Sequence, residues 1–103
     1  MGDFLKGNLK LLVLTLLSKH SFHGYALFKE LEKVYNWKPS CGTLYPVLSG
    51  LEEEGCINSA STIECGRFKK IYSLTGKGSA KLSELIMDFR ESLQALKLNE
   101  IQK

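Results

Sequence analysis

The alternation of apolar and polar positions is most distinctive at residues 37–55, where it predicts a short helix with one buried face. Its apolar residues recur at the i, i+3, i+4 and i+7 spacing of a helical stripe, namely Leu44, Val47, Leu48 and Leu51. The opposite face carries small and hydroxyl-bearing residues with one tyrosine, and no charge before Glu52. Solvated helix faces are usually rich in Lys and Glu. The bare face therefore indicates a surface that docks closely against another molecule.

The start of this helix is marked by Pro39, which disfavours a helical conformation at Lys38. Ser40 and Thr43 are both suited to cap the first free N–H groups. If the helix begins at Thr43, Pro46 falls in its first turn, where the missing N–H costs nothing. If it begins at Ser40, Pro46 removes one internal hydrogen bond and bends the helix. In both cases the free amides and the helix dipole attract phosphate.

Residues 5–17 predict a first helix with a broad apolar stripe of Leu5, Leu9, Leu12, Val13, Leu16 and Leu17. Phe4, Leu11 and Leu14 lie largely off this stripe. A helix that is apolar around most of its girth is buried on more than one side. Because so short a chain has little material to wrap such a helix, we expect one side of it to contact a partner chain.

A second helix is predicted at about 24–35, with an apolar face of Leu27, Phe28 and Leu31. His20 and His23 lie at its start and raise the question of a metal site. No acid or thiol nearby completes a ligand set, so a polar turn before a helix explains both histidines better. We expect no metal and no other cofactor.

Residues 57–62 and 68–74 alternate as two β-strands joined by a loop at 63–67. The period of two places Phe68, Tyr72 and Leu74 on one inward face. Lys70 falls on the same face, so we expect it near the open end of the hairpin, where its amine reaches water. Three helices followed by a hairpin with a basic tip make a winged helix-turn-helix, a mainly α fold with a small β-hairpin.

Thr75 is expected to cap a long last helix with an apolar stripe of Leu82, Leu85, Ile86, Phe89, Leu93 and Leu96. The stripe projects beyond the compact domain and cannot stay exposed to water. We expect it to pack on the first helix of a second subunit, with Leu11 and Leu14 in the interface of a two-fold dimer. The chain then divides into a winged-helix domain at 1–74 and a dimerisation helix at 75–103.

The charge of the chain is concentrated in one segment. A net charge of +3 over 103 residues is too mild to indicate nucleic acid by itself. Residues 64–81, however, hold one acid against five basic residues, which are Arg67, Lys69, Lys70, Lys77 and Lys81. The basic excess therefore lies at and just after the hairpin.

Three cysteines, Cys41, Cys56 and Cys65, form no C-x-x-C pair, which argues against a disulfide framework and a zinc site. We therefore expect a reducing, cytoplasmic compartment. The apolar run 9–17 contains Lys10 and is too short to span a bilayer, so no membrane segment is expected. Cys41 also raises the hypothesis of an oxidant sensor at a helix start. If a Cys41→Ser variant responded to mild oxidation as strongly as the wild type, that hypothesis would be excluded.

Four motifs occur in order along most of the chain. They are H-G-Y at 23–25, S-C-G-T-L-Y-P at 40–46, L-E-E-E-G at 51–55 and G-R-F-K-K-I-Y-S-L-T-G-K-G at 66–78. Together they resemble the PadR family of bacterial and archaeal transcriptional regulators, over about residues 9–78. The short chain is similar to the family's smaller subgroup with a single C-terminal helix. Two positions depart from the usual pattern: Cys41 replaces Pro or an aromatic residue, and Phe68 replaces Pro or a further basic residue.

These observations lead to the hypothesis of a dimeric transcriptional repressor that binds a pseudo-palindromic operator. The central helix would enter the major groove, and Arg67 would reach toward the minor groove. The residues expected to contact double-stranded DNA are Lys38, Ser40, Thr43, Tyr45, Ser49, Arg67, Lys69 and Lys70. The resemblance places DNA contacts at 43–45 and 66–70. It also implies release by a small aromatic or hydrophobic effector near the dimer interface.

Three alternatives bear on this hypothesis. Phe4, Met87 and Phe89 are suited to line an effector pocket, although core packing explains such residues more often. A winged helix can also be a protein-interaction module, which predicts weak and non-selective binding to any duplex. An enzyme is not expected, because no acid pair, activated nucleophile or phosphate loop is visible.

Overall fold

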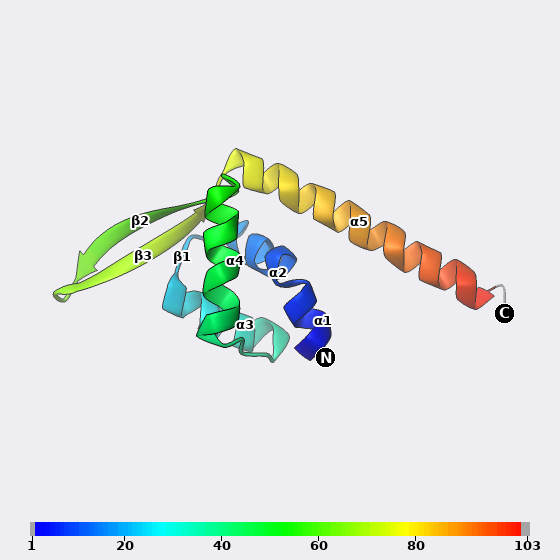
Figure 1. The fold of residues 1–103 in the computed structure, drawn as a ribbon, viewed down its shortest axis with the longest axis horizontal. Coiled ribbons are helices and arrows are strands. Elements are labelled where there is room, and N and C mark those ends of the chain that lie inside the picture. Colours follow the sequence, from blue (N-terminus) through cyan, green and yellow to red (C-terminus); the bar gives the residue numbers. More distant parts are fainter. Residues whose placement is uncertain (1, 102–103) are drawn as a thin grey trace.

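The protein is mainly helical, with a bent hairpin on one side and a long helix leaving on the other (Figure 1). The computed structural model describes residues 2–101. The helices are α1 (Gly2–Gly7), α2 (Leu9–Leu17), α3 (Gly24–Tyr35), α4 (Cys41–Glu53) and α5 (Gly76–Ile101). The strands are β1 (Phe22–His23), β2 (Ile57–Glu64) and β3 (Arg67–Leu74). The predicted winged helix-turn-helix with a long C-terminal helix is confirmed.

The hairpin, which we call the wing, is longer and more tightly closed than predicted. Its strands pair from Ile57 opposite Leu74 out to Glu64 opposite Arg67. The turn therefore contains only two residues, in place of the predicted five-residue loop, and both have positive φ, 52° at Cys65 and 75° at Gly66. Two-residue type I′ turns need this conformation and are usually signalled by Asn-Gly or Asp-Gly. A Cys-Gly pair gives no such signal.

A third strand, β1, lies where the sequence predicts a loop. It pairs with β3 through Phe22 opposite Tyr72, so the sheet order is β1-β3-β2. The hydroxyls of Ser21 and Ser73 lie 2.8 Å apart beside this pairing. Two residues are too few to display an alternating pattern, so only the approach of β3 makes this segment a strand.

The predicted first helix is interrupted at Asn8, whose side-chain amide donates to the Phe4 carbonyl at 2.8 Å. Six of the seven apolar residues of α2 are buried within their own chain, so little of this helix is left for the predicted contact with a partner chain. The helices α3, α4 and α5 and strand β3 all contact α2. Leu14 is completely buried and is therefore unavailable to a dimer interface, whereas Leu11 stays half-buried.

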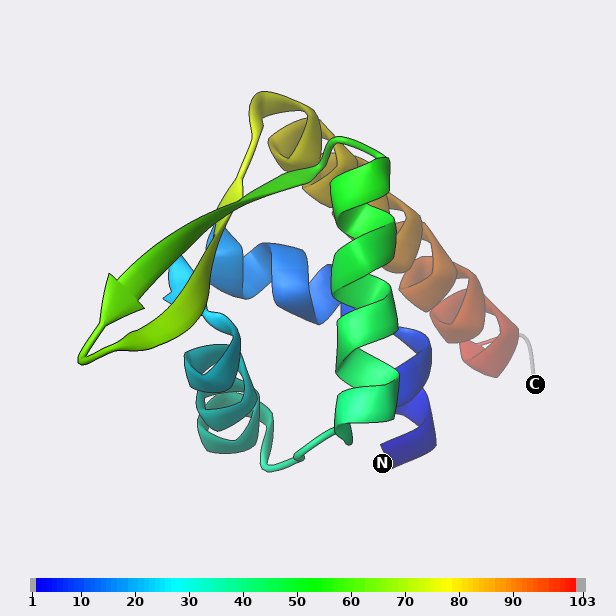
Figure 2. The same ribbon diagram turned by 60° about the vertical axis from the view of Figure 1, so that its left-hand side comes forward.

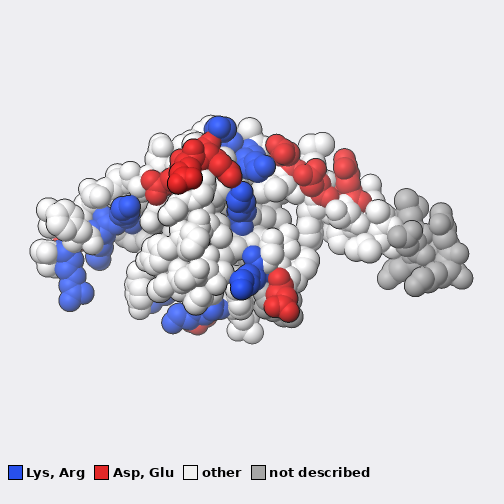
Figure 3. Space-filling view, viewed as in Figure 1, with Lys and Arg blue, Asp and Glu red and all other residues white. Residues whose placement is uncertain are grey.

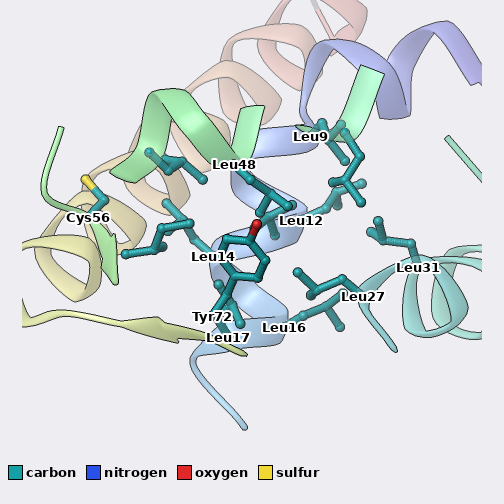
Figure 4. Packing of buried hydrophobic residues seen from close by; sticks show 14 of the residues in the cluster. Leu9, Leu12, Leu14, Leu16, Leu17, Leu27, Leu31, Leu48, Cys56 and Tyr72 are labelled. Carbon is teal, nitrogen blue, oxygen red and sulfur yellow. The ribbon is translucent and has the colours of Figure 1, made fainter. Parts of the chain in front are cut away.

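One hydrophobic core joins the helices to the base of the wing. The predicted inward faces of α3 and α4 are confirmed, since Leu27, Phe28, Leu31, Leu44, Leu48 and Leu51 are buried. Tyr72 points into the middle of this cluster (Figure 4). Phe68, predicted to face inward with it, is 81% exposed. The strand carries Phe68 past the edge of the domain, where the described residues leave most of its side chain uncovered.

Helix α5 begins near the C-terminal end of α4 and passes behind it in Figure 2. Thr75 caps it as predicted, because its hydroxyl accepts the Gly78 N–H at 3.0 Å. Leu82 is buried in the core of its own domain, so it has little surface to offer to the predicted dimer interface. Leu93 and Leu96 are exposed on the part of α5 that extends away, in a molecule 61 Å long. Residue 1 of the predicted winged-helix domain (1–74) and residues 102 and 103 of the predicted dimerisation helix (75–103) lie outside the described residues.

No helix within residues 2–101 combines the length and the apolar character that a membrane crossing requires.

Candidate nucleic-acid interface

Helix α4 turns its three buried leucines toward the core. The side chains on its outer face are small and, in the N-terminal half, uncharged. Ser40, Tyr45, Pro46 and Ser49 are exposed, and Thr43 is half-buried. The first acid of the helix, Glu52, accepts a hydrogen bond from the Ser59 hydroxyl at 2.9 Å. This carboxylate is therefore held at the base of the wing, away from the N-terminal half of α4. That half presents hydroxyl groups and no negative side chain.

Helix α4 begins at Cys41, one residue after Ser40. The Ser40 carbonyl accepts the Thr43 N–H at 3.0 Å, but its hydroxyl caps no backbone amide. The Ser40 and Thr43 hydroxyls instead lie 3.0 Å apart, so the two predicted caps are bonded to each other. Because the helix begins before Thr43, Pro46 lies in the second turn and leaves the Gly42 carbonyl without its usual helical donor.

Tyr45 lies across α3 and does not stand straight out from α4. Its ring meets Phe28 edge to face, with centroids 5.8 Å apart, and 42% of the residue stays exposed. Gly24 lies against two tyrosines, since a Cβ there would be in ordinary van der Waals contact, 3.4 Å from the Tyr45 hydroxyl and 3.6 Å from the Tyr72 ring. Burial raises the pKa of Tyr72 above its ordinary value, because it disfavours the charged phenolate. The start of α3, at the H-G-Y motif, thus packs against both tyrosines.

A groove of about 670 Å³ runs between the wing, the start of α3 and α4. Its walls combine aromatic rings with cations: His23, Gly24, Tyr25, Ala26, Tyr45, Arg67, Phe68, Lys69, Lys70 and Tyr72. Four of the eight predicted DNA contacts meet here, which are Tyr45, Arg67, Lys69 and Lys70. The other four, Lys38, Ser40, Thr43 and Ser49, lie on α4 and the segment before it, outside the groove.

Six of the ten groove residues were not among the predicted DNA contacts, and His23, Tyr25 and Phe68 are three of them. Tyr25 is 70% exposed, and the Lys29 ammonium lies 4.9 Å from its ring centroid. The His23 imidazole lies 3.8 Å from the Glu64 carboxylate, which also contacts the Lys69 ammonium at 3.3 Å. The H-G-Y motif contained the first two residues. Their proximity to the wing arises only from the pairing of β1 with β3.

Acids are more localised on the surface than cations. Figure 3 shows Lys and Arg on the wing and also over the rest of the domain, whereas Asp and Glu gather mainly over the C-terminal end of α4 and along α5. Lys10 and Lys81 lie beside these acids, 3.0 Å from Glu54 and 3.7 Å from Glu84. Within residues 2–101, no three His, Cys, Asp or Glu side chains meet as a metal site. The chemistry available at the wing is thus attraction of anions together with stacking on aromatic rings.

We expect Tyr45→Ala to lower the free energy of unfolding by about 1–2 kcal/mol, because the Phe28 contact is lost. Tyr45→Phe keeps the ring and should change it by less than about 0.5 kcal/mol, since a half-exposed hydroxyl loses little on removal. Urea unfolding followed by circular dichroism measures both variants. Equal destabilisation would mean that the hydroxyl, not the ring, holds Tyr45 in place.

Comparison with known proteins agrees with this geometry. Residues 13–84 match the family described as transcriptional regulator PadR-like. The transcriptional regulator Rv3488 of Mycobacterium tuberculosis is 33% identical over 84 residues, which cover 82% of this chain and 78% of the relative. A PadR family transcriptional regulator from Eggerthella lenta has a TM-score of 0.84 at 28% identity, over 91% of this chain and 82% of that one. Bacillus subtilis PadR in complex with operator DNA has a TM-score of 0.70 at 31% identity, over 76% of this chain and 46% of that one.

Proposed function

Because the chain belongs to the PadR-like family of transcriptional regulators, we propose that it binds double-stranded operator DNA as a homodimer and represses transcription. This family consists of regulators and not of enzymes. The observation that carries the proposal is the uncharged outer face of α4 beside the cation-lined groove of the wing. The complex of the Bacillus subtilis relative with operator DNA supports it.

In the proposed complex α4 enters the major groove, which is wide enough to admit a helix. The hydroxyls of Thr43, Tyr45 and Ser49 can both donate and accept hydrogen bonds to base edges or phosphates. The backbone contacts come from Lys38, Ser40, Lys69 and Lys70, and Arg67 reaches toward the minor groove. Since α4 carries no long cation on its outer face, phosphate contacts supply most of the affinity.

We propose that α5 supplies the dimer interface, with residues from 75 onward acting as the dimerisation segment. Leu93 and Leu96 are 42% and 62% exposed on a helix that leaves its own domain, and burying them on a second copy would be favourable. The proposed interface residues are Leu11, Leu85, Ile86, Phe89, Leu93 and Leu96. A two-fold axis then presents two α4 helices to half-sites about 34 Å apart.

A small aromatic or hydrophobic effector is proposed to release this dimer from DNA. Phe4 and Phe89 meet edge to face with centroids 6.1 Å apart, between α1 and α5, and Phe4 is 54% exposed. Met87 of the same helix is 61% exposed. The test is a panel of small aromatic compounds added to the DNA complex of the wild type and of Phe89→Ala. Release of the wild type alone supports the pocket, and release of neither excludes it.

The experiment for the main proposal uses a labelled duplex from the DNA immediately upstream of the protein's own gene. A scrambled duplex of equal composition is measured beside it, at two salt concentrations. Preferential binding that weakens with salt supports an operator-binding protein, and reduced transcription from that promoter in vitro supports a repressor. Equal or absent binding to both duplexes contradicts the proposal and favours a winged-helix protein-interaction module.

Arg67→Ala is expected to lower the slope of log affinity against log salt by about 1 for each wing in contact, because one phosphate-neutralising cation is lost. Binding titrations at several salt concentrations measure the slope. Lys19→Ala is the matched control, since Lys19 is an exposed cation outside the groove. A slope that changes equally in both variants would place Arg67 outside the DNA contact.

A further inference from the structure

Ile63 and Phe68 form an exposed apolar pair at the outer end of the wing. They are opposite each other across the two strands, so their side chains share one face of the hairpin. By the period of two, this is also the face of Tyr72, which is buried in the core. Ile63 is 67% exposed and Phe68 is 81% exposed. The face that packs the wing onto its domain thus ends in a bare aromatic–aliphatic pair.

This pair lies outside the hydrophobic core of the described residues. Large apolar side chains placed side by side in water mark a contact surface more often than single ones do. The hairpin register is already set by the Cys65-Gly66 turn and by the pairing of Ile57 with Leu74 in the core. The register of the wing therefore does not depend on this pair alone, and both side chains are exposed to a partner.

The charge around the pair identifies the kind of partner. Arg67, Lys69 and Lys70 are all exposed next to Phe68 and line the same groove. The nearby acid Glu64 is offset by the Lys69 ammonium at 3.3 Å and faces the His23 imidazole at 3.8 Å. An apolar tip inside a cationic rim is complementary to a surface with anionic edges and an apolar floor. A DNA minor groove offers such a surface once a base step opens, because phosphates line its edges, deoxyribose forms its walls and the faces of the partly unstacked bases are apolar.

We propose that Ile63 and Phe68 act as an apolar wedge in the minor groove of bound DNA, beside Arg67. This inference rests on the proposed DNA-binding function. Side chains of this kind partly unstack a base step and bend the duplex by about 20–90°. Pyrimidine–purine steps unstack most easily. The wedge would therefore add a sequence preference at steps that α4 does not contact.

The first test compares Phe68→Ala and Ile63→Ala with the wild type on the upstream duplex, at several salt concentrations. Removing the wedge is expected to weaken binding about tenfold, which corresponds to the loss of one buried apolar side chain. The salt slope should stay unchanged because no cation is removed, in contrast to Arg67→Ala. Val34→Ala is the control, since Val34 is 52% exposed on α3. Both wedge residues are exposed, so the variants should fold normally.

The outcomes separate this inference from the function on which it rests. A wild type that does not distinguish the upstream from the scrambled duplex overturns both. If the wild type prefers the upstream duplex, but Phe68→Ala and Ile63→Ala bind this duplex as tightly as the wild type does, the wedge is overturned and the DNA-binding function stands. Fluorescence transfer between dyes at the duplex ends should report bending by the wild type and less by Phe68→Ala, and an unbent duplex overturns the wedge. Phe68-dependent binding to phosphatidylglycerol vesicles, with unchanged DNA affinity, would assign the pair to an anionic membrane surface.

Discussion

Replacing Gly78 with alanine is expected to lower the free energy of unfolding by about 2–3 kcal/mol, because no space exists for the added methyl group. A Cβ on Gly78 would overlap the Cys56 carbonyl oxygen and lie 2.7 Å from a methyl group of Leu74. The Cys56 carbonyl cannot swing aside, since it is backbone and also accepts the Thr75 N–H at 3.1 Å. The first turn of α5 would have to move away from the base of the wing.

Gly76→Ala is the control, because it lies two residues earlier in the same helix turn and a Cβ there meets nothing within 4 Å. Alanine should leave stability unchanged or raise it by up to about 1 kcal/mol. Urea unfolding measures both variants. If both unfold at the same urea concentration, the close contact of α5 with Cys56 is wrong. This contact matters for function because it sets the direction in which α5 leaves the domain.

Leu93→Glu is expected to raise the dissociation constant of the proposed dimer by at least about 100-fold, since each subunit would bury an unpaired carboxylate. Operator affinity should fall with it, because a single α4 contacts only one half-site. Sedimentation velocity at several protein concentrations measures the dimer, and binding to the upstream duplex measures the consequence. The domain should stay folded, since Leu93 lies outside the described core and is 42% exposed.

Ala95→Glu is the matched control for this variant. It introduces the same carboxylate at an exposed position of α5, about 160° around the helix from Leu93. The dimer should tolerate it. A monomeric wild type at tens of micromolar would contradict the dimer itself. Equal dissociation by Ala95→Glu would contradict the face that we assign to the interface.

The helical part of the fold was predictable because helical periodicity is local. The spacing of Leu27, Phe28 and Leu31 in α3, and of the leucines in α4, indicates which face is buried without knowledge of what covers it. The cap at Thr75 was predictable for the same reason, since a hydroxyl needs only the amide three residues later. Four residues of the candidate site, Tyr45, Arg67, Lys69 and Lys70, also followed from local motifs and charge.

Two errors are local, the length of the turn at Cys65-Gly66 and the break of the first helix at Asn8. The others concern contacts between segments that are distant in the sequence. Because α2 is apolar around most of its circumference, the sequence suggested a contact with a partner chain. In the structure α3, α4, β3 and α5 cover α2, so Leu14 of α2 and Leu82 of α5 belong to the core. The alternation of β3 placed Phe68 inward, but the period of two does not say where the domain ends. Strand β1 and the membership of Tyr25 in the groove depend on a pairing across about 50 residues.

The sequence by itself determined the type and order of the helices, the polar face of α4 and the basic segment of the wing, because these follow from side chains a few positions apart. Only the tertiary structure decided that α2 is internal, that Tyr45 lies across α3, and that the side chains of Ile63 and Phe68 are exposed to solvent. Burial depends on which distant segment lies opposite a residue, and no local pattern contains that information.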